Sequence, residues 1–182
     1  MSIVEFRQYT LRPGARETLI ELFEREFVTG QQAAGITVGG RFRDLDDPAR
    51  FVWLRGFPDM RRRRLALEAF YTGPVWRRHR DAANATMLDS DDVLLLRGPG
   101  FTADPGLREV SATVCHPSDT RSFDTYAAQH LTPTHALHST EHAENDYPLL
   151  PVRTGEDARL WFGQAEPPPW PTRRLRLEPV TG

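Results

Sequence analysis

The order of strand-like and helix-like patterns constrains the fold of this chain more than any other feature of its sequence. In the first half, segments that alternate apolar and polar residues flank two segments with apolar residues at helical spacing. The strand patterns cover residues 2–11, 35–45, 50–57 and 90–98, and the helical patterns cover residues 15–28 and 58–84. The order strand, helix, strand, strand, helix, strand predicts a ferredoxin-like unit over residues 1–98.

A turn-rich linker, "RGPGFTADPGL", precedes a second pattern over residues 107–182. Strand patterns recur at residues 108–116, 136–144, 158–164 and 173–179, with one helical pattern at residues 118–131. Where the second helix is expected, the chain has "AEPPPWPT" instead, and proline blocks helix interiors. We therefore expect an α+β protein of two tandem ferredoxin-like halves, the second lacking its second helix.

Composition narrows the class of protein. The chain has 182 residues, 39% hydrophobic, with a net charge of -2, which fits a globular protein with one domain or two small ones. No apolar run approaches the roughly 20 residues that span a bilayer, and "MSIVEFRQYT" is not a signal-peptide pattern. We expect a cytoplasmic protein without a membrane partner. Cys115, the single cysteine, excludes an intramolecular disulfide and cysteine-rich metal sites.

All 23 basic residues are arginine. This excludes Schiff-base chemistry on lysine and a P-loop lysine, and it favours carboxylate or phosphate clamps and ion pairs. A lysine-free, arginine- and alanine-rich chain also indicates a GC-rich bacterial genome. The run Arg61–Arg64 spreads around a helix and forms no basic stripe, so we expect no nucleic-acid partner.

Several segments resemble one family. "VEFRQYTLRPG", the block from "FVWLRGFPDMRRRR" to "RRHRDAANATM", and "SDDVLLLR" are similar to a NIPSNAP-type domain of the dimeric α+β barrel group. "ENDYPLLPVRTGEDARLWFG" is similar to the second half of longer bacterial members. The resemblance implies that two four-stranded sheets, here in one chain, pack into an intramolecular barrel with helices outside. It also implies a ligand cavity between sheet and helices. In the trimmed half we expect this cavity to be more open, or to be covered by the proline-rich segment with Trp170 packed in it.

Four of the six histidines lie between residues 130 and 142. Strand alternation places His138 and His142 on one face, where either could act as a general base, with Asn145 donating to a developing oxyanion. The structural alternative for Asn145 is a plain turn. A divalent metal, or haem bound through His130 or His142, is a further alternative; the spacing matches no metal motif, so we expect no cofactor.

A second set of candidates projects from the first sheet. Glu5, Arg7 and Tyr9 share one strand face, and Trp53 and Arg55 would join them from a neighbouring strand. Two arginines beside aromatic rings suit a substrate carboxylate and its ring. The alternative, which we favour, is packing between sheets inside the barrel, with Glu5 paired to an arginine. Further candidate substrate contacts are Tyr147 and Trp161.

The leading functional hypothesis is a cofactor-independent isomerase, cyclase or oxygenase acting on a small carbonyl-bearing or aromatic molecule in bacterial specialised metabolism. Its chemistry would be acid/base catalysis through histidine. The first alternative is a non-catalytic protein that binds a small ligand or a partner. The second is a haem or metal protein. A homodimer remains open, because exposed edge strands could pair two chains.

Overall fold

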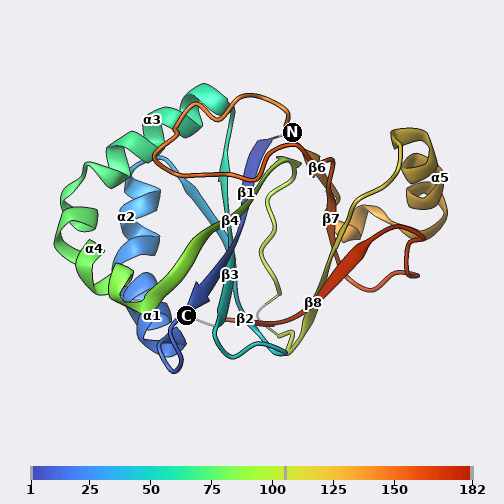
Figure 1. Cartoon of the computed structure of the whole chain (residues 1–182). Helices are drawn as coiled ribbons and strands as arrows, with labels where there is room; N and C mark the ends of the chain where they lie inside the picture. The colour runs from blue at the N-terminus through green and yellow to red at the C-terminus, as the bar shows by residue number, and fades with distance from the viewer. Residues whose placement is uncertain (1, 105, 181–182) are drawn as a thin grey trace.

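The computed structural model describes residues 2–104 and 106–180, which form a closed barrel of antiparallel strands (Figure 1). Around the barrel the strand order is β1-β3-β2-β8-β5-β7-β6-β4. The strands are β1 (Ser2–Leu11), β2 (Thr37–Asp44), β3 (Arg50–Phe57), β4 (Met87–Gly98), β5 (Val110–Cys115), β6 (His138–Thr140), β7 (Arg159–Phe162) and β8 (Thr172–Pro179).

Both halves of the chain build the same four-stranded sheet. The first half has the order β4-β1-β3-β2, and the second half repeats it as β8-β5-β7-β6. The two sheets join edge to edge, where β2 pairs with β8 and β4 pairs with β6. A closed barrel removes exposed sheet edges, so the second half takes the place that a partner sheet would occupy. The predicted intramolecular α+β barrel is confirmed.

The helices of the first half lie together on the outer face of its sheet (Figure 1). One continuous helix consists of α1 (Arg16–Leu22), a π-helical turn η1 (Phe23–Phe27) and α2 (Val28–Ala33), and a second helical segment consists of α3 (Met60–Tyr71) and α4 (Pro74–Thr86). Asp59 caps α3 by accepting the Arg62 amide at 2.7 Å, and Pro74 begins α4, where its missing N–H costs nothing.

The second half has α5 (Thr120–His130) and a short 3-10 turn η2 (Pro133–His135), and residues 163–171 contain no helix. The expected trimming of this half is therefore confirmed. Trp170 from the proline-rich segment packs on Phe123 and Tyr126 of α5, with ring centroids 6.1 and 5.8 Å away. Trp170 also packs against the cluster that contains Trp161 of β7, so the proline-rich segment takes part in the packing of this half.

Alternation along the strands divides the core into two layers. Val4 and Phe6 point into the barrel, where residues of both sheets form one apolar cluster. Tyr9 and Trp53 point outward and pack against the helices of the first half. The predicted face with Glu5, Arg7 and Tyr9 is real, but the favoured placement of it inside the barrel is wrong, because the neighbouring apolar residues fill the barrel instead.

The strand predicted at residues 136–144 is shorter than expected. Only His138–Thr140 form the strand. The Glu141 amide still donates to Leu95 O of β4 at 2.9 Å, and the chain then turns away from the sheet where the Glu141 side chain accepts the Ala143 amide at 2.9 Å. Within the part of the chain that the structure describes, no helix is long and apolar enough to cross a membrane.

Candidate functional site

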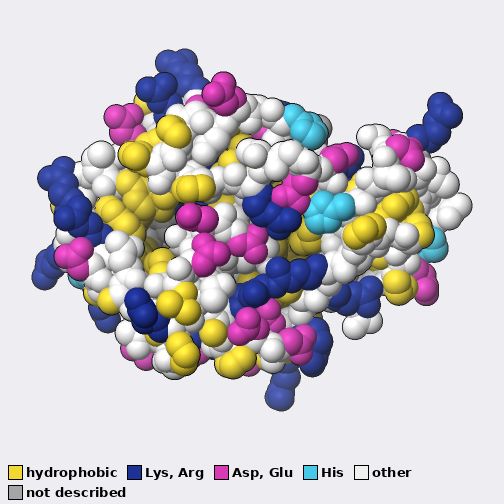
Figure 2. All heavy atoms as spheres, in the orientation of Figure 1, with side chains coloured by type: hydrophobic (Ala, Val, Ile, Leu, Met, Phe, Trp, Pro, Cys, Tyr) yellow, Lys and Arg dark blue, Asp and Glu magenta, His cyan; other side chains and the backbone are white. Residues whose placement is uncertain are grey.

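A cavity of about 120 Å³ lies between the first sheet and its helices. Its walls are largely aromatic, and Arg7 provides a charged group among them. Figure 2 shows a hollow rimmed by hydrophobic side chains, with acidic side chains beside it over β4. The lining residues are Arg7, Tyr9, Leu19, Phe23, Phe27, Gln31, Trp53, Phe70, Tyr71, Trp76, Asn84, Met87, Ser90 and Leu150.

The π-helical turn shapes one wall of this cavity. Phe23 and Phe27, its first and last residues, both line the cavity, and their rings meet edge to face at 6.0 Å. Phe23 also contacts Trp53 on the sheet at 4.7 Å between ring centroids. π-turns within α-helices occur often at functional sites, and this one turns two large rings toward the same space.

A buried cluster of charges lies at the sheet side of the cavity. The Glu5 carboxylate accepts from three guanidiniums: Arg7 Nη1 at 2.5 Å, Arg55 Nε at 2.7 Å and Arg63 Nε at 2.7 Å. Glu5 and Arg7 are on β1, Arg55 lies opposite Glu5 on β3, and Arg63 reaches down from α3. Burial would raise the pKa of the Glu5 carboxyl, but Arg55, Arg7 and Arg63 hold that pKa well below its usual range.

This cluster carries an excess of positive charge. Arg63 Nη1 has a second carboxylate partner, Asp146, at 3.0 Å, so three guanidiniums share two carboxylates. Glu5, Arg55 and Arg63 are fully buried and Arg7 nearly so. Buried charges are costly unless they are compensated. The cluster is therefore suited to a negatively charged group in the adjoining cavity.

Several donors around the cluster have no acceptor among the described residues. These are Arg55 Nη2, Arg63 Nη2 and the indole Nε1 of Trp53, all buried. Arg7 itself donates from Nε to the Tyr9 hydroxyl at 3.2 Å and from Nη2 to Ser90 O at a long 3.4 Å. Of these unpaired donors only the Trp53 indole lines the cavity, where an oxygen-bearing ligand would supply the acceptor that it lacks.

A strap from the second half closes over the first. We define the strap as residues 141–153; both of its ends are tied to β4, by the Glu141 amide to Leu95 O and by the Arg153 amide to Val93 O at 2.8 Å. In Figure 1 it passes from β6 over α3. Asn145 and Asp146 both accept from Arg63 Nη1 at 3.0 Å. The strap therefore contacts the same charge cluster through Arg63.

The predicted catalytic residues do not share one site. His138 is fully buried in β6; its Nε2–H donates to Pro99 O at 2.6 Å, and its ring packs edge to face on Phe162 at 6.0 Å. Burial lowers the pKa of His138, which keeps the ring neutral. His142 lies on the strap with its side chain 73% exposed. Asn145 accepts from Arg63 and donates from Nδ2 to Leu150 O at 2.9 Å, so its side-chain amide is used in holding the strap in place.

The predicted substrate contacts converge better. Arg7, Tyr9 and Trp53 line the cavity. Arg55 lies directly behind it, where its Nη1 donates to the Tyr71 hydroxyl at 3.2 Å. Tyr147 stacks on Tyr71 from the strap, with ring centroids 6.3 Å apart.

Trp161 belongs to a different cluster, under α5 with Phe123 and Tyr126. Among residues 2–104 and 106–180, no group of three His, Cys, Asp or Glu side chains is placed to hold a metal ion. Cys115 is buried, and burial raises the pKa of its thiol to about 11, which opposes thiolate chemistry.

Sequence patterns missed part of the site. Gln31, Tyr71 and Trp76 come from helices and line the cavity, and Arg63, which the sequence analysis treats only as part of the Arg61–Arg64 run, is buried against Glu5. The signal for Arg63 was present: it shares a helix face with Leu67 and Phe70, which are buried. Leu150 could not be assigned, because no local pattern shows where a loop folds back.

The fold and the cavity define an α+β barrel protein with a pocket between one sheet and its helices. The family profile of NIPSNAP matches residues 4–97, just over half of the chain. The chain therefore belongs to the NIPSNAP family. No curated protein matches the sequence.

Solved structures agree with this fold. A NIPSNAP family protein from Agrobacterium tumefaciens is 18% identical, with a TM-score of 0.50 over 56% of this chain and 97% of that one. A candidate monooxygenase from Fusobacterium nucleatum is 8% identical, with a TM-score of 0.60 over 99% and 93%. An anthrone oxidase-like protein is 11% identical, with a TM-score of 0.61 over 99% and 92%. At these identities the likeness concerns the fold alone.

Proposed function

We propose that this NIPSNAP protein binds a small organic anion, a carboxylate or an enolate, in the cavity of its first half. The observation that carries the proposal is Arg7, a nearly fully buried guanidinium that lines an aromatic cavity within a cluster of excess positive charge. An anion beside Arg7 would compensate that charge. The aromatic walls would pack against the apolar body of the ligand.

The size of the cavity limits the ligand. An apolar protein cavity of about 150 Å³ holds benzene, and this one measures about 120 Å³. The part of the ligand that lies inside the cavity is therefore compact, with about five or six heavy atoms. A ligand with its charged end at Arg7 and a short apolar body toward Phe27 and Phe70 would compensate the positive charge and pack against the aromatic walls.

Cofactor-independent chemistry on a bound carbonyl compound is the second candidate. The Tyr9 hydroxyl accepts from Arg7 Nε, and burial raises the pKa of Tyr9, so the hydroxyl stays protonated and can donate to a developing oxyanion. However, among the described residues that line the cavity there is no His, Asp, Glu or Cys. Without such a base, the cavity supports anion binding better than histidine-dependent proton abstraction.

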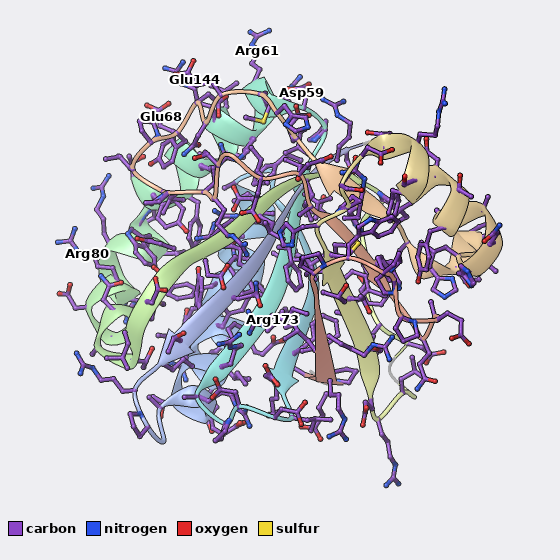
Figure 3. All side chains as sticks on the ribbon, turned by 45° about the vertical axis from the view of Figure 1, so that its right-hand side comes forward. Asp59, Arg61, Glu68, Arg80, Glu144 and Arg173 are labelled. Carbon is purple, nitrogen blue, oxygen red and sulfur yellow. The ribbon has the colours of Figure 1, made fainter. Side chains whose placement is uncertain are left out.

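Calorimetric titration with propionate and with its neutral isostere propionamide tests the proposal. We expect propionate to bind and propionamide to bind at least about tenfold more weakly. Arg7→Met should remove this preference, because it removes the charge and keeps much of the side-chain length. Arg61→Met is the matched control, since Arg61 points into solvent from the start of α3 (Figure 3). Equal binding of acid and amide, or none of either, would refute the proposal.

A further inference from the structure

Among residues 106–180, which the structure describes of the second half, Leu150 is the one that lines the cavity. All the other lining residues come from residues 7–90, within β1, β3, β4 and the helices of the first half. Resting on the proposed function, we infer that Leu150 and the strap that carries it determine how large an anion the cavity accepts. The second half would thus supply the specificity element of a site whose charge comes from the first half.

The strap holds Leu150 in place through its backbone. Asn145 Nδ2 donates to Leu150 O at 2.9 Å, and the Leu150 amide donates to Tyr147 O at 3.1 Å. Pro148 lies within this turn and Pro151 follows it, and each proline has a fixed φ angle. Leu150 is therefore a wall with a defined position.

The same strap is joined to the charge cluster. Asn145 Oδ1 accepts from Arg63, whose Nε donates to Glu5, which in turn binds Arg7 inside the cavity. Tyr147 stacks on Tyr71, a second cavity residue. An unbroken set of contacts thus links the wall formed by Leu150 to the guanidinium that would hold the anion. Displacement of the strap would remove a wall of the cavity and two partners of Arg63 together.

Neighbouring Leu149 provides a matched control. It is 80% exposed and does not line the cavity, yet it lies on the same turn and has the same side chain. Replacement of Leu150 by alanine enlarges the cavity, whereas replacement of Leu149 removes the same atoms from the surface. Both variants lose the same side-chain atoms, so any difference in their ligand preference arises from the position of Leu150 in the cavity wall.

The experiment is calorimetric titration of wild type, Leu150→Ala and Leu149→Ala with propionate and with benzoate, which carry the same charge. We expect Leu150→Ala to shift the benzoate-to-propionate affinity ratio at least about tenfold toward benzoate, since one methylene in a pocket discriminates by a comparable factor. Leu149→Ala should keep the wild-type ratio. Equal benzoate-to-propionate ratios in the two variants would overturn the inference. The proposed function would still stand in that case if wild type binds propionate.

A second variant covers the event that Leu150→Ala does not fold. Asn145→Ala loses the Nδ2 donor to Leu150 O without adding a charge to the cluster, and Asp146 remains as the strap's acceptor for Arg63. We expect it to weaken size discrimination while its preference for propionate over propionamide persists. An unchanged benzoate-to-propionate ratio in this variant counts against the inference, and absence of propionate binding by wild type overturns the inference and the proposed function together.

Discussion

Glu5 on β1 lies directly opposite Arg55 on β3, and Arg55 Nε donates to Glu5 Oε2 at 2.7 Å with both side chains fully buried. The pair is the centre of the charge cluster, because the same carboxylate also holds Arg7 and Arg63. Through Arg55 and Arg63, Glu5 joins β1 and β3, the two central strands of the first sheet, to α3. We therefore expect a change in this pair to alter both the stability of the first half and the positive charge beside the cavity.

Removal of the Glu5 charge should be strongly destabilising. Glu5→Gln would leave three buried guanidiniums with one partly exposed carboxylate, and breaking a buried pair typically costs about 3–5 kcal/mol. Urea denaturation would measure this loss in the free energy of unfolding. Glu17→Gln is the comparison, because Glu17 pairs with Arg43 with its side chain 54% exposed. There we expect about 0–1 kcal/mol; a similar cost for both variants would contradict the account of the cluster.

Loss of Arg63 should loosen the strap. Arg63→Met removes the donor to Asn145 and Asp146, so the amides of residues 145–147, 149 and 150 should exchange with deuterium faster than in wild type. Hydrogen exchange followed by mass spectrometry would show this locally. Arg61→Met, on the same helix, should leave strap exchange unchanged. Identical exchange in the two variants would mean that Arg63 does not hold the strap.

His138 should make stability depend on pH. Burial lowers its pKa in the folded protein below the ordinary value of 6.5, so the unfolded chain binds the proton more readily. Stability from this group is complete above pH 6.5 and decreases as pH falls toward the folded pKa. The slope contributed is at most about 1.4 kcal/mol per pH unit.

Urea titrations at pH 7.5 and 5.5 would measure this effect. The loss of stability on acidification should be smaller in His138→Gln than in wild type. His142→Gln, which alters an exposed side chain, should lose as much stability as wild type. If His138→Gln and wild type lose stability equally, His138 is not the group responsible.

The sequence predicted most of the fold for a clear physical reason. Alternating residues such as Val4, Glu5 and Phe6 belong to strands with two different faces, and proline in "AEPPPWPT" blocks a helix by chemistry that no tertiary contact can alter. Which face of the first sheet fills the barrel was predicted wrongly. Alternation separates the two faces of a strand, but it cannot say which of them meets the helices.

The site was predictable only in part. Arg7, Tyr9 and Trp53 share a face by strand geometry, and they line the cavity. His138 and His142 were grouped by the same rule, but the strand ends at Thr140 and the rule does not hold beyond it. Leu150 lies far in sequence from every other lining residue. Its contribution depends on contacts that form only when the barrel closes.

The most direct test of the account is a crystal structure of the protein with 3-bromopropionate, a compact carboxylate whose bromine can be located by anomalous scattering. We predict one bromine site inside the cavity, with the carboxylate oxygens in hydrogen-bond contact with the Arg7 guanidinium and the bromine toward Phe27 and Phe70. Bromine sites elsewhere on the protein, with the cavity free of the ligand, would contradict the claim that this cavity binds small organic anions.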